Sequence, residues 1–235
     1  MADVLILAGG SPHAHDFAAI GGALLELVRG SGHEGSLTDD PDAGAADLND
    51  GFDAAILCGL WWRMAGEAYD HWRPDYGYET PEATRHSLRT FVAEGGGLIA
   101  LHTATICFDD WPEWRTIIGG RWLWGASNHP PYGPVSAEVV ADHPVVACLP
   151  DTIELHDEVY GDLALQDDIE VLAVAKRGLE DAAQPVIWTH HYRAGRVVYD
   201  GFGHDAASIR HPQNARVLRQ ALRWVTSDDR GACSD

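Results

Sequence analysis

Residues 95–104 read Gly-Gly-Gly-Leu-Ile-Ala-Leu-His-Thr-Ala, which is a tight glycine turn, a short apolar run and a histidine where that run stops. An unbroken apolar run bounded by glycines is typical of a strand buried on both faces of a parallel sheet. Ligands of open α/β sheets bind just beyond the carboxyl ends of the strands. His102 is therefore a candidate ligand or acid/base group. The alternative is a polar residue that only caps its strand.

Strand and helix patterns alternate through the first hundred residues. Apolar runs followed by glycine predict strands, and apolar residues at helical spacing between them predict helices. The predicted strands cover residues 4–8, 36–38, 54–58 and 97–101, and the predicted helices cover 16–29 and 81–94. Such alternation with short turns favours a mostly parallel sheet with helices on both faces.

The second half of the chain is less regular. Its predicted strands cover residues 135–140, 169–175, 185–190 and 196–200, with a hairpin turn at 192–195 and a closing helix at 212–226. His190 and His191 lie next to this turn and are expected at the surface. We find no internal repeat and no linker, and expect one domain over residues 1–228 with a frayed polar tail at 229–235. The predicted fold is α/β, a flavodoxin-like three-layer α/β/α sandwich.

The composition restricts the partners of this protein. Sixteen basic and 36 acidic residues among 235 give a formal net charge of −20. A surface of this sign repels nucleic acid and anionic membranes, because both require a basic patch. No apolar run approaches the roughly 20 residues of a membrane-spanning helix, and the N-terminal segment lacks a basic flank. We therefore expect a cytoplasmic protein that binds neither nucleic acid nor membrane.

Histidines are frequent, and several follow predicted strands. The chain has 13 histidines, of which His15, His102, His129 and His204 lie just after predicted strands or in glycine-rich loops. Glu158 lies in the segment Glu-Leu-His-Asp-Glu-Val-Tyr between them. Because the ends of parallel strands converge, we expect these five side chains to face one pocket. For each histidine the alternative is a purely structural role.

Imidazole and carboxylate groups support two kinds of chemistry. They are the usual general acids and bases, and we assign this role to His102, Glu158 and His204. They are also the usual ligands of zinc and similar divalent metals. A metal site would combine His102, His129 and His204, although its ligands would come from distant parts of the chain. A divalent metal such as zinc is thus a candidate cofactor.

Aromatic residues add a second clue to the ligand. Seven of the nine tryptophans lie in segments that follow strands, and exposed aromatic faces in a crevice suit the apolar faces of sugars. For most of them, packing of long loops onto the sheet is the simpler explanation. The residues predicted to contact a substrate are His15, Trp61, Trp62, Thr103 and Tyr160.

The position of His102 and Thr103 between a strand and a helix matches that of a nucleophile elbow, which holds a serine or cysteine on a strained turn. No Gly-x-Ser-x-Gly or Gly-x-Cys-x-Gly motif occurs there. Thr103 is a poor nucleophile without an adjacent base, and Cys107 lies too far along the chain to occupy the elbow. These features disfavour a thiol amidotransferase or peptidase.

The ordered set of short motifs resembles the ThuA-like family, which is named for trehalose utilisation. The matching pieces are residues 15–17, 95–104, 119–121 with His129, 143–145, 157–160, 185–188, 195–199 and 203–205. The resemblance covers roughly residues 3–226. It implies a fold similar to class I glutamine amidotransferases, with a histidine and a small residue where those enzymes carry the cysteine nucleophile.

The resemblance also implies a role in the use of trehalose or a related disaccharide or keto-sugar. An enzyme of this kind would be a carbohydrate-active hydrolase, lyase or isomerase with a small carbohydrate as its ligand. The alternative is a non-catalytic sugar-binding or regulatory module on the same fold. Fold similarity alone does not decide between them, and the sequence leaves homo-oligomerisation open.

Overall fold

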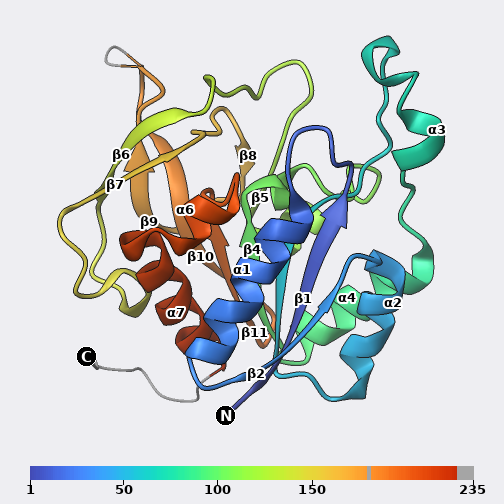
Figure 1. The fold of residues 1–235 in the computed structure, drawn as a ribbon, viewed down its shortest axis with the longest axis horizontal. Coiled ribbons are helices and arrows are strands. Elements are labelled where there is room, and N and C mark those ends of the chain that lie inside the picture. The colour runs from blue at the N-terminus through green and yellow to red at the C-terminus, as the bar shows by residue number, and fades with distance from the viewer. Residues whose placement is uncertain (179–180, 227–235) are drawn as a thin grey trace.

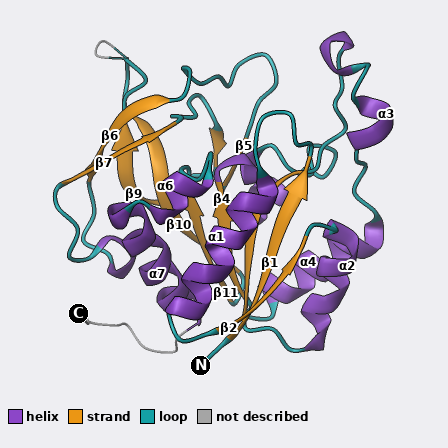
Figure 2. Ribbon diagram, viewed as in Figure 1, coloured by secondary structure: helices purple, strands orange, loops and turns teal. Residues whose placement is uncertain are grey.

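The computed structural model describes residues 1–178 and 181–226, and a nine-stranded sheet forms the centre of the molecule (Figure 1, Figure 2). In spatial order its strands are β2 (Glu34–Thr38), β1 (Asp3–Gly10), β3 (Ala54–Leu60), β4 (Gly97–Leu101), β11 (Gly195–Asp200), β10 (Gln184–Tyr192), β9 (Glu170–Ala175), β6 (Gly133–Val139) and β7 (Thr152–Asp157). The strands from β2 to β11 are parallel, and every neighbouring pair from β11 to β7 is antiparallel.

Helices cover both faces of the sheet. One face carries α1 (Phe17–Gly30), α6 (Ala206–Arg210) and α7 (Pro212–Thr226), and the other carries α2 (Pro41–Asp47), α4 (Glu82–Ala93) and α5 (Trp114–Ile118). The short α3 (Arg73–Tyr76) lies in the long segment after β3, at the edge of the molecule in Figure 1. The sheet therefore separates two hydrophobic cores, as in a three-layer sandwich.

The remaining elements are short. A two-stranded ladder joins β5 (Gly120–Arg121) to β8 (Ala164–Leu165), and single 3₁₀ turns occupy residues 48–50, 67–69, 102–105 and 144–146. The turn at 102–105 directly follows β4. It therefore begins at the carboxyl edge of the parallel strands, where the candidate site lies.

Alternate residues of the parallel strands supply the two cores. In β1, Val4 and Ile6 belong to the core under α1, whereas Leu5 and Leu7 belong to the core on the opposite face. All four side chains are at most 2% exposed. Burial of such a side chain contributes about 1.5–3 kcal/mol, so a strand that is apolar at every position is stabilised from both sides.

The predicted elements of the first half are confirmed, with boundaries shifted by at most two residues. In the second half, the structure confirms the strands near 135–140, 169–175, 185–190 and 196–200, the turn at 192–195 and the helix at 212–226. The predicted α/β fold is confirmed, with a mixed central sheet built around a parallel core.

Two expectations need correction. The antiparallel half is larger than predicted, because β7 was not recognised: its apolar residues Ile153 and Leu155 alternate with exposed polar residues. His190 is not at the surface. It lies in β10, inside the sheet, is 4% exposed, and donates from Nε2 to the carbonyl of Thr116 at 2.9 Å. His191 is exposed as expected, because neighbouring strand residues face opposite sides.

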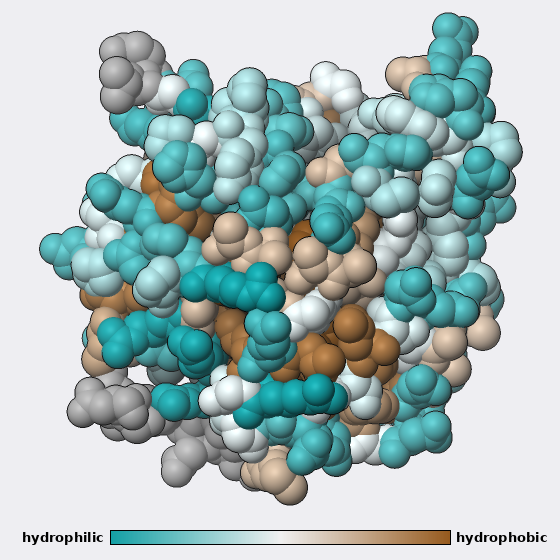
Figure 3. Space-filling view, in the orientation of Figure 1, coloured by the Kyte–Doolittle hydropathy of each residue, from teal (hydrophilic) through white to brown (hydrophobic). Residues whose placement is uncertain are grey.

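The surface agrees with the acidic composition. Polar side chains cover most of the face in Figure 3, and apolar ones gather in its middle, around α1. Among the described residues, no helix is long and apolar enough to cross a membrane. The tail predicted at 229–235 lies outside the described residues.

Candidate active site

His102 stands at the centre of the candidate site, directly after β4. Its backbone adopts a left-handed conformation, with φ of +44°, which is uncommon for a residue other than glycine and typical of strained functional turns. The side chain is fully buried. Its Nδ1 donates to the carbonyl of Gly201 at 2.9 Å, and its own carbonyl accepts from the Tyr199 hydroxyl at 2.9 Å. The end of β11 therefore fixes the imidazole in one orientation.

The carboxylate of Glu158, which follows β7, lies among three imidazoles. Its oxygens are 3.5 Å from Nε2 of His102, 3.4 Å from Nδ1 of His204 and 3.3 Å from Nδ1 of His129. Burial raises the pKa of Glu158, but the neighbouring imidazoles of His102 and His204 outweigh this effect and hold the pKa well below its usual value. Glu158 is therefore ionised at neutral pH.

Asp157, next to Glu158, organises the loop that carries His204. This carboxylate is 1% exposed and accepts from the backbone of Gly203 at 2.8 Å, from the backbone of Glu158 at 2.7 Å and from the hydroxyl of Ser208. No role for Asp157 was predicted from the sequence. Its position directly before the candidate residue Glu158 was the only signal available.

His15 completes the cluster from the loop after β1. Its Nδ1 donates to the carbonyl of His204 at 3.1 Å, and its ring centroid lies 5.1 Å from that of His102 and 4.6 Å from that of His204. Burial, reinforced by the neighbouring His102, lowers the pKa of His15 to about 4, so this imidazole is neutral at pH 7. One ring nitrogen each of His15, His102 and His204 lies within 4.8 Å of the other two.

Aromatic rings form one wall of the site. The buried Tyr160 donates its hydroxyl to Nε2 of His102 at 3.1 Å, since Nδ1 of that ring already carries the proton. Trp122 packs edge-on against Tyr160, with centroids 5.1 Å apart. Tyr132, 40% exposed, covers His204 at 4.9 Å between centroids. The reactive groups therefore lie below a partly exposed aromatic rim.

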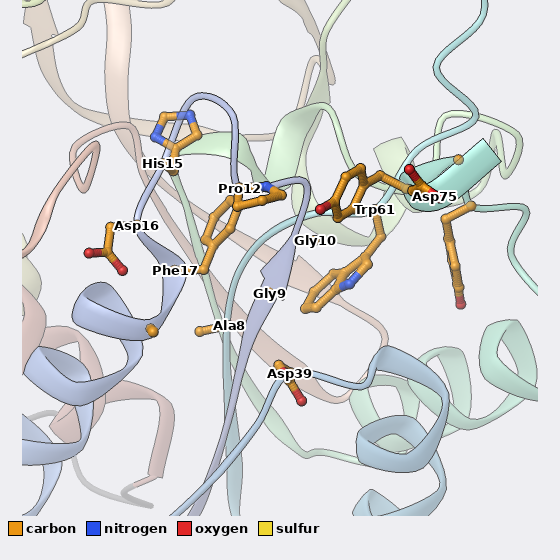
Figure 4. Close-up of a pocket in the computed structure, with 14 residues that line it drawn as sticks. Ala8, Gly9, Gly10, Pro12, His15, Asp16, Phe17, Asp39, Trp61 and Asp75 are labelled. Carbon is orange, nitrogen blue, oxygen red and sulfur yellow. The ribbon is translucent and has the colours of Figure 1, made fainter. Parts of the chain in front are cut away.

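A cavity of about 700 Å³ adjoins this cluster (Figure 4). It lies over the carboxyl ends of β1 and β3, where the chain leaves β1 toward one face of the sheet and β3 toward the other. Such switch points are the usual ligand sites of open α/β sheets. Its lining residues include His15, Trp61, three carboxylates and three further aromatic rings, namely Asp16, Asp39, Asp75, Phe17, Tyr76 and Tyr78.

The cavity and the histidine cluster share His15. In Figure 4 the His15 ring lies on one side of the cavity, above Phe17, and Trp61 lies on the opposite side. A ligand that fills the cavity would therefore contact the outer edge of the cluster.

The structure gathers most of the predicted site residues. His15, His102, Glu158, His204, His129 and Tyr160 contact one another, and Trp61 lines the adjoining cavity. Two predicted substrate contacts lie elsewhere. Trp62 stacks on Trp124 with centroids 4.4 Å apart, and Thr103 is fully buried with its hydroxyl against the Cys58 thiol.

His129 also departs from its predicted role. It is not one of the three histidines whose nitrogens lie close enough to share an ion, and His15 takes that place. The ring of His129 packs instead on Tyr160, and its side chain is 37% exposed. His129 therefore connects Glu158 to solvent.

Cys107 does not provide a nucleophile. Its thiol is 2% exposed, donates to the carbonyl of Gly59 at 2.8 Å, and has a pKa raised by burial to about 12. A thiol with this pKa holds almost no thiolate at neutral pH. His102, and not Cys107, directly follows β4 at the position predicted for the elbow.

The fold is similar to that of class I glutamine amidotransferase-like proteins, and His102 directly follows its strand β4. The chain belongs to the ThuA family: the family model described as trehalose utilisation matches residues 3–225. No protein of curated function matches the chain in sequence.

Solved structures agree with this fold. A protein of Parabacteroides merdae described as ThuA-like superposes with a TM-score of 0.77 at 18% identity, over 99% of this chain and 92% of that one. A second such protein, from Bacteroides uniformis, gives 0.73 at 21% identity, over 97% and 91%. A GMP synthase-like protein of Thermoplasma acidophilum gives 0.58 at 14% identity, over 94% and 92%.

Proposed function

We propose that this protein is a cytoplasmic enzyme of carbohydrate utilisation that acts on trehalose, a related disaccharide or a keto derivative of one. The family description supports the substrate class. The observation that carries the proposal is the buried, ionised Glu158, which lies within 3.5 Å of three imidazoles at the carboxyl edge of the sheet. An ionised carboxylate held in one orientation is available to accept a proton, and the adjacent imidazoles are available to relay it.

Glu158 acts as the general base. In a hydrolase it removes a proton from the attacking water, and in a lyase or isomerase it removes a proton from the carbon next to a keto group. His102 and His204 position the carboxylate, and Tyr160 offers a hydroxyl from the same side. His129, the most exposed imidazole of the cluster, passes the proton on to solvent.

The adjoining cavity binds the sugar. Aspartate carboxylates accept hydrogen bonds from sugar hydroxyls, and the indole of Trp61 offers an apolar surface. A volume of about 700 Å³ is within the range of small-molecule sites and accommodates a disaccharide. His15, at the junction, contacts the end of the sugar that faces Glu158.

A non-catalytic sugar-binding or regulatory module is the second candidate. The depth of the cluster favours it, since His102 is fully buried and the side chain of Glu158 is only 9% exposed. A panel of disaccharides and their keto forms distinguishes the two, measured by product formation and by calorimetry. Turnover that depends on Glu158 supports the enzyme. Binding without any product, for every sugar tested, supports the module.

A further inference from the structure

We propose that His15, His102 and His204 form a binding site for one divalent transition-metal ion of the zinc class. Neutral imidazole is the preferred protein ligand of such ions. Within the described residues, these three form the cluster whose ring nitrogens lie mutually within 4.8 Å. The inference goes beyond the proposed function, because metal binding requires neither a sugar nor turnover.

The tautomers support the assignment. Nδ1 of His102 donates to the carbonyl of Gly201, and Nδ1 of His15 donates to the carbonyl of His204. A carbonyl only accepts, so each Nδ1 carries the proton and each Nε2 keeps a free lone pair. Histidines that bind metals are usually held in this way by a second group at the other ring nitrogen.

His204 follows the same pattern with a carboxylate. Its Nδ1 is buried and faces Glu158 at 3.4 Å. This contact places a carboxylate beside the second ring nitrogen, and a small rotation would make it the carboxylate–histidine hydrogen bond that orients metal ligands. Glu158 would therefore be an outer partner of the metal, not a ligand.

Charge balance favours a cation at this position. Asp157 and Glu158 are two neighbouring buried carboxylates, and in the described structure the ion pairs found for them are to histidines. A divalent ion between three imidazoles would compensate both carboxylates, because buried charges require a partner.

The geometry needs only a small adjustment. Nitrogens that share a tetrahedral zinc ion lie about 3.3 Å apart, given metal–nitrogen distances of about 2.0–2.1 Å, so the rings must approach from their present separation. Tyr160 must also release Nε2 of His102. Three ligands leave one position open, which is the arrangement of catalytic rather than structural zinc sites.

The test uses the full chain without a polyhistidine tag. After treatment with a chelator and its removal, calorimetry with Zn²⁺ is expected to give one ion per chain. Co²⁺ is expected to give the visible absorption of a four- or five-coordinate site. His15→Ala and His204→Ala should each lower the affinity by more than the roughly 10–100-fold that loss of an outer partner costs. The loss of Zn²⁺ affinity in Glu158→Gln should lie within this range of about 10–100-fold for an outer partner.

Two control variants make the test specific. His86→Ala removes an exposed histidine on α4, and His129→Ala removes the site histidine that is not a proposed metal ligand. Both variants should bind Zn²⁺ like the original chain. Circular dichroism verifies folding of each variant. The proposal is overturned if the folded chain binds no Zn²⁺ or if His15→Ala binds it unchanged. Loss in His129→Ala but not in His15→Ala also overturns it.

The outcomes separate this proposal from the proposed function. Turnover of a sugar by protein that binds no metal rejects the metal site and leaves the enzyme standing. Stoichiometric Zn²⁺ binding without turnover of any sugar supports the metal site and rejects the proposed enzyme.

Discussion

The carboxylate of Glu158 and the imidazole of His204 lie 3.4 Å apart, although the two residues are 46 positions apart in the chain. Asp157 makes this contact possible, because it binds the backbone of Gly203 and so attaches the loop after β11 to the end of β7. Two strand ends thus build one acid/base pair. Its properties give the first prediction.

Glu158→Gln should abolish turnover and preserve sugar binding. The amide keeps the shape and hydrogen-bonding capacity of the carboxylate but accepts no proton, so we expect kcat to fall by about 10²–10⁴-fold. The Kd for the same sugar, measured by calorimetry, should change less than about threefold. A variant that retains more than a tenth of the original kcat would rule out Glu158 as the base.

Replacement of His102 should destabilise the fold, because the side chain is fully buried and so does more than cap its strand. His102 is fully buried, so His102→Ala should cost about 2–5 kcal/mol in the free energy of unfolding. Because φ is +44°, His102→Gly should recover about 1–2 kcal/mol of this loss. Urea unfolding of both variants provides the measurement. An alanine variant as stable as the glycine variant would contradict the strained turn.

Asp200→Asn should change the dependence of stability on pH. Asp200 is fully buried at the end of β11, and burial raises its pKa well above the usual value. An acid whose folded pKa is raised loses stability as pH rises from its unfolded pKa, near 3.8, through its folded pKa. The asparagine variant lacks this titration. It should therefore gain stability relative to the original chain as pH increases from 4 to 8.

Unfolding by urea at several pH values measures this difference. The exposed Asp151→Asn serves as the matched control and should show no such trend. A constant difference between Asp200→Asn and the original chain at every pH would mean that Asp200 does not titrate abnormally.

The fold was predictable where strands are apolar on both faces. Runs such as Leu5–Leu7 and residues 97–101 are unambiguous, since no other element is short, uniformly apolar and bounded by glycine. Strand β7 was not predictable in this way: it lies at the edge of the sheet, and its burial alternates. The interior position of His190 depends on the pairing of β10 with two strands, which local sequence does not specify.

The sequence predicted most of the residues that form the candidate site, but it did not predict which of them contact one another. Convergence of parallel strand ends accounts for His102 and His204, whereas Glu158 follows the antiparallel edge strand β7, which was not predicted. Local sequence could not show that His15, rather than His129, joins the other two imidazoles, because a bond to the backbone of His204 fixes that ring. It also could not show that Thr103 faces Cys58, since the turn after β4 sets that direction.

The cavity should select neutral sugars over phosphorylated ones. Asp16, Asp39 and Asp75 line it, and His15 carries no charge at pH 7. The N-terminus of α1, a position that often binds phosphate, is already capped by Asp16, which accepts from the backbone of Ala19 at 3.0 Å. Like charges within a few ångströms repel, so a disaccharide phosphate should bind at least about tenfold more weakly than the free disaccharide at low ionic strength.

Two changes should reduce this selectivity. Added salt screens exposed charges, so the ratio of the two Kd values should decrease between about 20 mM and about 500 mM NaCl. The double variant Asp39→Asn/Asp75→Asn should reduce the ratio at low salt, whereas Asp151→Asn, on the distant side of the sheet, should not. Calorimetry with matched free and phosphorylated disaccharides measures both effects. Equal affinity for the two ligands in the original chain would show that the sugar does not occupy this cavity in contact with its carboxylates.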